Sequence, residues 1–323
     1  MQEGLSMSLR WPPVGIALVC PRCKHRLEET EVQLQCLVCA ARYEVLASGA
    51  PCLLSVSPER ENGAAARKDE VKRMFTAFHQ ALEENGLSRF CKFINWGYAA
   101  EEDTASVLTA GVNHNSIRLL KEILNGLDLT GMDILEVACG RGGNVRELFK
   151  SWSPRSVVGL DLTEANIAFC QTNNRHPHSY FFVGDAEELP IGTECCDIVL
   201  NVESSDLYPH IDSFYMEVYR VLKPGGMFVY ADDLAAEKFE EGERYLRNLG
   251  FELQQSRDIT DNALRSSDLA LRNRLAAFGG SDRMNEEIIS TMGVPGTPIY
   301  DDMRSGKRKY KILHFRKPAS HDA

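Results

Sequence analysis

The stretch "ILEVACGRGGN", residues 134 to 144, decides the fold of this chain. Apolar residues and one acid lead directly into a turn of small residues, with glycines at 140, 142 and 143. A strand that runs through glycines into a helix brings backbone N–H groups close to a ligand, because no Cβ stands in the way and a helix N-terminus favours negative charge. The stretch therefore predicts a strand, a ligand-binding turn and a helix.

Short apolar runs alternate with helical patterns from residue 132 onward. The runs that read as buried strands are "MDILEVA", "SVVGLDL", "SYFFVG", "CDIVLNV" and "GMFVYAD". This alternation predicts an α/β fold in which helices cover both faces of a parallel sheet. A last strand, "YKILHFRK", follows a stretch of about fifty residues that holds another helical pattern and that we interpret as a cap.

The spacing of the glycines limits which kind of ligand the turn can bind. Pyrophosphate binders usually show GxGxxG, whereas Glu136, Ala138, Gly140 and Gly142 form ExAxGxG. This pattern resembles the first motif of class I S-adenosylmethionine-dependent methyltransferases, with Ala138 in place of the first glycine. Later segments match the same family in order: Asp161, 21 residues after Gly140, then "GDAEELP", then "RVLKPGGMFVYAD" (220–232).

The resemblance implies S-adenosylmethionine as the cofactor and a set of residues around it. Asp161 would accept hydrogen bonds from both ribose hydroxyls, as the acid at this place does in doubly wound folds, and Asp185 and Ala186 stand at the adenine position. The cofactor-binding residues implied are Tyr98, Glu136, Ala138, Gly140, Gly142, Asn144, Asp161, Leu162, Asp185, Ala186 and Asn201.

Two segments point to a narrower group. "NWGY" (95–98) and "NVESSDLYPH" (201–210) resemble the small-molecule methyltransferases of the phthiotriolone and rebeccamycin type, which act on polyketide and lipid natural products. The resemblance implies that Tyr98 contacts the methionine end of the cofactor and that the second segment lines the substrate pocket. The expected reaction is methylation of a small hydrophobic metabolite, on oxygen first, with carbon or nitrogen as the second option.

The expected catalytic residues are Glu203, Asp206 and His210. Asp206 stands where the family commonly has His. A carboxylate near a pKa of about 4 is a poor base for an alcohol unless burial raises it, whereas a His near 6.5 is well matched to neutral pH. His210 could take the role, or an acidic phenol or enol could need little help. The other interpretation is that Glu203 and Asp206 only cap the helix that begins near residue 210.

Four cysteines near the front of the chain form two close pairs. Cys20, Cys23, Cys36 and Cys39 stand as CxxC, twelve residues, CxxC, a spacing that lets two tight turns present four thiolates to one tetrahedral Zn²⁺ at about 2.3 Å. With "Y-x-V…G-x-P-x-L" following, the segment resembles the Trm112-like zinc-ribbon module, whose members support methyltransferases as partners. Four thiolates leave no open position, so the expected zinc is structural.

Bulk properties exclude several classes of protein. A net charge of -10 without a long basic run disfavours a nucleic-acid partner, and no apolar run reaches the ~20 residues of a membrane span. Ten cysteines without a secretory signal indicate a cytoplasmic protein with thiols or thiolate ligands. The expected partner is a small-molecule acceptor, and the sequence is compatible with a homodimer.

The complete expectation is a Rossmann-like, doubly wound, seven-stranded sheet with a helical cap, preceded by a zinc-ribbon module. The expected parts are a tail (1–18), the zinc ribbon (19–56), a linker (57–70), a helical lead-in and cofactor lid (71–127) and the methyltransferase domain (128–323), with its cap at about 259–306. Two alternatives stay open: an rRNA or tRNA methyltransferase whose zinc ribbon recognises RNA, and a non-catalytic interaction protein that keeps the fold.

Overall fold

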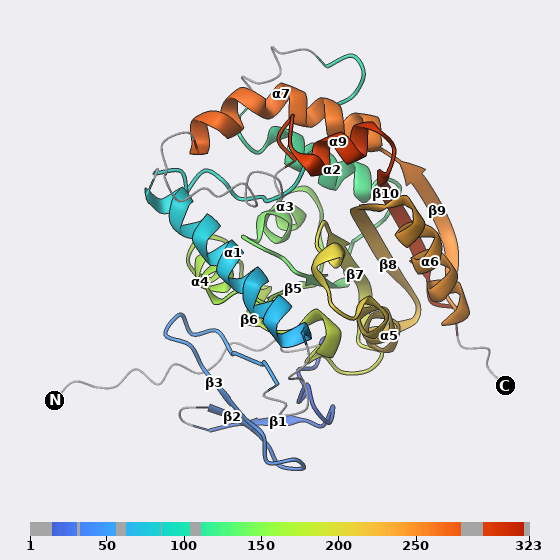
Figure 1. Ribbon diagram of the computed structural model, residues 1–323. Helices are drawn as coiled ribbons and strands as arrows, with labels where there is room; N and C mark the ends of the chain where they lie inside the picture. The colour runs from blue at the N-terminus through green and yellow to red at the C-terminus, as the bar shows by residue number, and fades with distance from the viewer. Residues whose placement is uncertain are drawn as a thin grey trace.

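A seven-stranded sheet forms the centre of the molecule (Figure 1), with strand order β6-β5-β4-β7-β8-β10-β9. The computed structural model describes residues 15–30, 33–55, 63–84, 86–103, 111–278 and 293–319. The strands are β4 (Asp133–Val137), β5 (Ser156–Asp161), β6 (Ser179–Val183), β7 (Cys196–Val202), β8 (Leu222–Ala235), β9 (Glu252–Asp258) and β10 (Arg308–Arg316). Strands β4 to β8 pair in parallel, and β10 pairs antiparallel with β8 and β9. The predicted seven-stranded Rossmann-like sheet is confirmed.

The character of each strand follows from its place in the sheet. Every residue of β4 and β5 is buried, as expected for parallel strands covered on both faces. Strand β9, at one edge, alternates between exposed and partly buried residues. Its sequence "ELQQSRD" is polar, and a polar edge discourages pairing with another chain.

Helices divide the apolar side chains into two cores, one on each face of the sheet. On one face α5 (Ile211–Val221) and α6 (Ala236–Asn248) contribute Phe214 and Phe239. The other face is covered by α2 (His114–Ile123), α3 (Gly143–Ser151) and α4 (Glu164–Asn173), together with α7 (Thr260–Phe278) and α9 (Pro298–Arg304). Short 3-10 helices η2 (Ala186–Glu188) and η3 (Ser205–Leu207) follow β6 and β7.

The front module is a small antiparallel sheet below the main sheet in the view of Figure 1. Its strands are β1 (Leu27–Glu29), β2 (Gln33–Cys36) and β3 (Arg42–Glu44), in that order. Leu34 and Tyr43 of this module belong to the same buried cluster as Leu135 and Val199 of the main sheet. The module and the catalytic fold therefore share one core on this face.

Two further parts lie around the sheet. Helix α1 (Ala64–Glu84) crosses in front of it in Figure 1, so the helix begins within the segment expected to be a linker, whose residues 57–62 lie outside the described residues. In the region of the expected cap, α7 and α9 are described and residues 279–292 are not. Among the described residues, no helix is long and apolar enough to cross a membrane.

Candidate active site

A cavity of about 350 Å³ lies at the carboxyl ends of strands β4 to β8, where ligands bind in open parallel sheets. Helix α1 and residues 92–95 form its other wall. Ten of the predicted cofactor and catalytic residues line it: Glu136, Ala138, Gly140, Asn144, Asp161, Leu162, Asp185, Ala186, Glu203 and Asp206. Tyr98, Gly142, Asn201 and His210 are not among its lining residues.

Three residues of the glycine turn after β4 have left-handed backbone: Ala138, Gly140 and Gly142, with φ of 58°, 51° and 69°. Left-handed backbone costs an alanine roughly 1–2 kcal/mol, so the fold holds Ala138 in a conformation that suits glycine better. A Cβ at Gly142 would lie 2.8 Å from Cys170 Sγ and 2.9 Å from Asn174 Nδ2. The absence of a side chain at Gly142 therefore lets the turn pack closely against α4, and Gly142 does not form part of the cavity wall.

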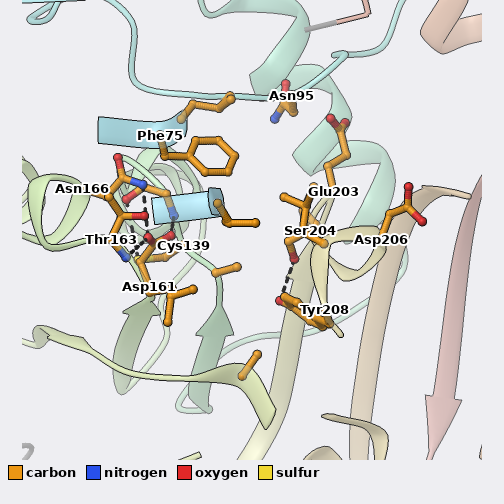
Figure 2. A pocket seen from close by; sticks show the side chains of 18 of the residues that line it. Phe75, Asn95, Cys139, Asp161, Thr163, Asn166, Glu203, Ser204, Asp206 and Tyr208 are labelled. Carbon is orange, nitrogen blue, oxygen red and sulfur yellow. Dashed lines mark hydrogen bonds between the residues drawn. The ribbon is translucent and has the colours of Figure 1, made fainter. Parts of the chain in front are cut away.

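Asp161, at the end of β5, is a fixed acceptor in the cavity wall (Figure 2). One carboxylate oxygen accepts a hydrogen bond from Gly140 N at 2.9 Å, and the other accepts from Thr163 N at 2.8 Å and Asn166 Nδ2 at 3.2 Å. Burial raises the pKa of Asp161, and these hydrogen bonds oppose the rise. A carboxylate offers about four acceptor positions, which leaves capacity for a ligand hydroxyl.

Glu136 carries an unsatisfied acceptor at the same end of the cavity. Its Oε1 accepts from Asn144 Nδ2 at 2.7 Å, while its buried Oε2 has no hydrogen-bond partner in the part of the chain that the structure describes. Burial raises the pKa of Glu136 to about 8. A cationic group of a ligand would both satisfy Oε2 and favour the ionised carboxylate.

Asp185 and Ala186 line the cavity after β6, and helix α1 reaches down to them. Lys68 of α1 donates to Asp185 Oδ2 and to Glu187 Oε2, each at 2.5 Å. The Asp185 Oδ1 accepts from Glu187 N at 2.9 Å, which fixes the carboxylate at the start of η2. This contact ties the helical lead-in to the predicted adenine position.

Arg141 joins the glycine turn to the same helix from the other side. Its guanidinium is 1% exposed and lies 3.6 Å from the ring centroid of Phe169. It donates to the carbonyl oxygens of Cys91 at 2.8 Å and Ser88 at 2.7 Å, and it contacts Nδ1 of His79 in α1. Within the described residues, the hydrogen bonds of this buried cation therefore tie the glycine turn to α1 and to the residues that follow it.

Glu203 lies across the cavity from Asp161 (Figure 2). It follows β7 with a φ of 51°, and its two oxygens accept from Trp96 N at 3.0 and 2.9 Å. Tyr310 of β10 donates its hydroxyl proton to the same carboxyl at 2.7 Å. Burial and then the nearby Asp233 charge raise the pKa of Glu203 well above its ordinary value. Such a group can accept a proton near neutral pH.

The other two expected catalytic residues are placed differently. Burial favours a higher pKa for Asp206, but its bonds to Lys238 at 2.6 Å and Arg308 at 3.1 Å outweigh burial and lower the pKa. An ionised, paired carboxylate is a weak proton acceptor. His210 is exposed at the start of α5, and its backbone N–H donates to Glu187.

Asn201 and Tyr98 are outside the set of residues that line the cavity. Asn201 is fully buried, and its amide nitrogen donates to Val137 O at 3.1 Å and to the Tyr208 hydroxyl at 3.0 Å. The backbone next to Tyr98 is held by α7, because Ser266 Oγ donates to Trp96 O at 2.8 Å. The Tyr98 ring lies 5.8 Å from the Arg118 guanidinium.

Comparison with known proteins adds a family to this geometry. A family model for the methyltransferase domain matches residues 135–230. The phthiotriol/phenolphthiotriol dimycocerosates methyltransferase of Mycobacterium leprae is 35% identical over 264 residues, which cover 79% of this chain and 96% of that protein. The fatty-acid O-methyltransferase of Mycolicibacterium smegmatis is 34% identical over 233 residues, covering 70% and 84%.

The chain belongs to the phthiotriol dimycocerosates methyltransferase family. It is an S-adenosylmethionine-dependent methyltransferase, as the sequence predicts. Solved structures share its fold: the cyclase SpnF (TM-score 0.60, 18% identity, 78% of this chain and 97% of that chain) and the geranyl diphosphate C-methyltransferase of Streptomyces coelicolor A3(2) (TM-score 0.57, 14% identity, 78% and 98%).

The cavity of the methyltransferase fits its cofactor by the chemistry of its donors and acceptors. The partnerless Oε2 of Glu136 suits the ammonium group of the methionine end, and the remaining acceptor position of Asp161 suits a ribose hydroxyl. Asp185 and Ala186 at the far end leave a place for the adenine. Glu136, Asp161 and Asp185 lie at the carboxyl ends of three neighbouring strands, β4, β5 and β6. One extended ligand can therefore reach all three residues.

The four predicted metal ligands of the methyltransferase come together in the front module. The Sγ atoms of Cys20, Cys23, Cys36 and Cys39 all lie within 4.8 Å of one another. The distances are 3.5 Å for Cys20–Cys39 and 3.3 Å for Cys23–Cys36. Four thiolates at this separation match the corners of a tetrahedral zinc site with bonds of about 2.3 Å.

Sequence reasoning missed several residues that line the methyltransferase cavity. Asp232 and Asp233 lie at the end of β8, where the sequence analysis noted a family motif but no site residue. Lys68 falls in the expected linker, and Arg308 is brought in by the antiparallel strand β10. Val71 and Phe75 of α1 also line the cavity, and they belong to the segment 71–127 that was expected to be a helical lead-in and cofactor lid.

Proposed function

We propose that this methyltransferase transfers a methyl group to an oxygen of a small hydrophobic metabolite, such as a lipid or a polyketide. The observation that carries the proposal is Glu203, a buried carboxyl with a raised pKa in the same cavity as Asp161. When bound, S-adenosylmethionine supplies a methyl group on a positively charged sulfur, which a nucleophile attacks in line. The role of the chain is to position that nucleophile and to take up its proton.

Glu203 is the proposed base. Its ionised carboxylate accepts the proton of the acceptor hydroxyl, while Tyr310 and the Trp96 amide hold the carboxyl in place. Its burial keeps the proton affinity high enough for this step near neutral pH. Asp206 is proposed to support the site through its ion pairs with Lys238 and Arg308, and no role in the chemistry is assigned to His210.

The walls of the cavity support a hydrophobic acceptor. Apolar side chains from four separate segments line it: Val71 and Phe75, Ile94, Leu207, and Ile299. The relatives named above act on lipids or a fatty acid according to their names. At the other end, four acids, Glu203, Asp206, Asp232 and Asp233, line the cavity together with Arg308, a set that offers little attraction to the phosphates of a nucleic acid.

Product analysis with methyl-labelled S-adenosylmethionine tests this assignment. We expect label to enter the organic extract when the enzyme is supplied with hydrophobic alcohols, phenols or long-chain fatty acids. Mass spectrometry of the product is expected to show the methyl on oxygen. Label in transfer or ribosomal RNA, with none in the organic extract, would contradict the proposal.

We propose that the four clustered cysteines hold one structural zinc. Metal analysis of the purified protein is expected to give one zinc per chain, because the thiolates complete a tetrahedral site. Cys36→Ser is expected to lose the metal, since three thiolates bind it far more weakly. Cys52→Ser is the control, because Cys52 lies in the same module outside the cluster. Equal zinc in Cys36→Ser and wild type would rule out the site.

A further inference from the structure

The segment that carries the adenine position is hydrogen-bonded to the front module at both of its ends. At the end that leaves β6, Val183 N donates to Pro51 O at 2.9 Å and Leu53 N donates to Val183 O at 2.8 Å. Residues 51–53 thus continue the main sheet beyond its β6 edge for one bridge. Asp185 follows two residues later in the cavity wall.

The second attachment lies just after η2. Val19 N donates to Pro190 O at 2.9 Å, and Gly192 N donates to Ala17 O at 2.7 Å, with Leu18 and Ile191 forming an antiparallel bridge. The residues 184–188 between the two attachments include Asp185, Ala186 and Glu187, all in the cavity wall. The front module and the residues just before it therefore hold both ends of the stretch that carries the predicted adenine position.

Lys24 connects this stretch to the cysteine cluster itself. It follows Cys23 directly, with a left-handed φ of 62° and a backbone N–H that donates to Cys20 O at 2.8 Å. Its Nζ donates to Leu189 O at 3.2 Å and to Glu217 Oε2 of α5 at 2.7 Å. The position of this side chain depends on the turn that Cys20 and Cys23 form around the metal.

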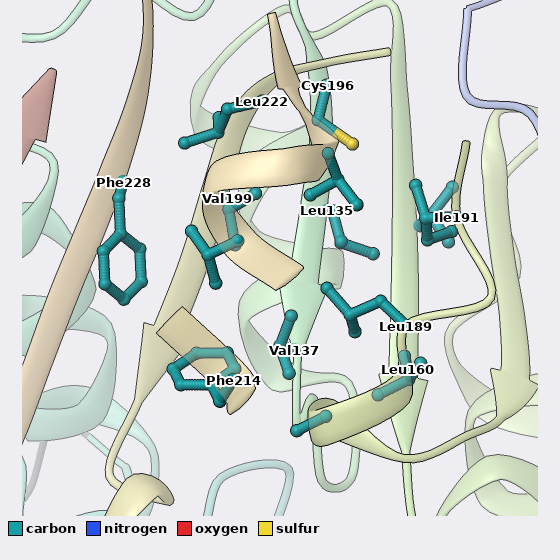
Figure 3. Packing of buried hydrophobic residues seen from close by; sticks show 14 of the residues in the cluster. Leu135, Val137, Leu160, Leu189, Ile191, Cys196, Val199, Phe214, Leu222 and Phe228 are labelled. Atoms are coloured by element: carbon teal, nitrogen blue, oxygen red, sulfur yellow. The ribbon is translucent and has the colours of Figure 1, made fainter. Parts of the chain in front are cut away.

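Apolar packing reinforces these polar contacts. Cys20, Cys36 and Leu53 of the module belong to the same buried cluster as Leu189 and Ile191. Figure 3 shows Leu189 and Ile191 beside Leu135 and Leu160, whose strands end at the cavity. A loss of order in the module would therefore reach the segment after β6 through both the backbone and the core.

We propose that the metal site and the cofactor site are energetically linked, with the zinc module acting as the outer support of the adenine-contact segment and Lys24 as a positioning residue. The inference rests on the proposed zinc and on the adenine position of the methyltransferase site. Linkage is reciprocal, so bound cofactor should tighten metal binding by the same factor by which metal tightens cofactor binding. Zinc thereby affects the reaction through the affinity for the cofactor, without contacting the substrate.

Calorimetric titration with S-adenosylhomocysteine tests the linkage on the full chain, without a turnover assay. We expect the Kd to rise about tenfold after zinc is removed with a chelator and to recover when zinc is added back. Lys24→Met is expected to raise the Kd by about fivefold with its zinc content unchanged. Arg22→Met is the control and should leave the Kd unchanged, because Arg22 is an exposed cation between Cys20 and Cys23.

Hydrogen exchange supplies the readout that separates positioning from general destabilisation. The amides of Val183 and Gly192 are expected to exchange faster in zinc-free protein and in Lys24→Met, while those of β7 stay protected. A Kd within twofold of wild type in folded zinc-free protein would overturn the linkage. If zinc removal unfolds the chain, an unchanged Kd in zinc-loaded Lys24→Met overturns it instead. Failure of zinc-loaded wild type to bind at all would reject the cofactor site itself.

Discussion

Glu203→Gln is expected to lower kcat by roughly 10²–10⁴-fold while leaving the Kd for S-adenosylhomocysteine unchanged. The amide keeps the shape of the side chain but cannot take up the proton of the acceptor. Glu203 lies across the cavity from the cofactor residues, so cofactor binding does not depend on it. Single-turnover methylation, together with calorimetry of the variant, measures the two effects separately.

The pH profile gives a second readout for Glu203. Because burial raises its pKa above the ordinary value of 4.5, kcat/KM of the wild type is expected to rise with pH through a range well above 4.5. This rising limb of the pH profile should be absent in Glu203→Gln. The folded state binds this proton more tightly than the unfolded state, so the stability it contributes is present at low pH and is lost as pH rises through the folded pKa.

Two results would contradict the role of Glu203. One is a variant that retains more than a tenth of the wild-type rate, and the other is an unchanged pH limb. Asp206→Asn provides the matched comparison, since Asp206 lines the same end of the cavity but is paired with Lys238 and Arg308. We expect it to slow the reaction by less than tenfold and to keep the pH limb.

Asp161→Ala is expected to weaken cofactor binding by roughly 10–10²-fold, because a hydrogen bond from a ribose hydroxyl to a charged acceptor contributes about 1.5–3 kcal/mol. The variant also removes the acceptor for Gly140 N and Thr163 N, which loosens the turn itself. Calorimetric titration with S-adenosylmethionine measures the loss.

The control for Asp161 lies three residues further along the chain. Glu164 is an exposed acid in the first turn of α4, and Glu164→Ala should bind the cofactor like the wild type. Thermal melting of Asp161→Ala is expected to remain cooperative. Wild-type affinity in Asp161→Ala would remove this residue from the cofactor site, and global unfolding would refute its description as a binding residue.

Site residues and strands could be predicted from the sequence where a short stretch of the chain determines their position. Gly140, Asp161 and Asp185 lie at or just after the ends of parallel strands, and the strand order brings them to one edge, so their spacing was sufficient to predict that they line one cavity. The fold class followed from the same runs. Strand β9 could not be predicted from an apolar run, because it is an edge strand that faces water and its sequence is polar.

The remaining site residues required long-range packing that no local pattern encodes. Lys68 reaches Asp185 only because α1 lies across the cavity. Arg308 arrives through the antiparallel pairing of β10 with β8, far along the chain from Asp206. For Tyr98, the sequence motif was visible, but α7 and α2 decide its backbone position, so Asn95 of the same motif lines the cavity instead.

The buried guanidinium of Arg141 bears on how α1 can move. It donates to Ser88 and Cys91 and contacts His79, so swinging that end of α1 outward would strand a desolvated cation without acceptors. The other end of the helix is held over the cavity by Lys68, and withdrawing Lys68 would leave the buried carboxylate of Glu187 without its cation. Both ends of α1 are therefore fastened by buried charged groups, and moving either end away from the cavity would leave one of these groups without its partner.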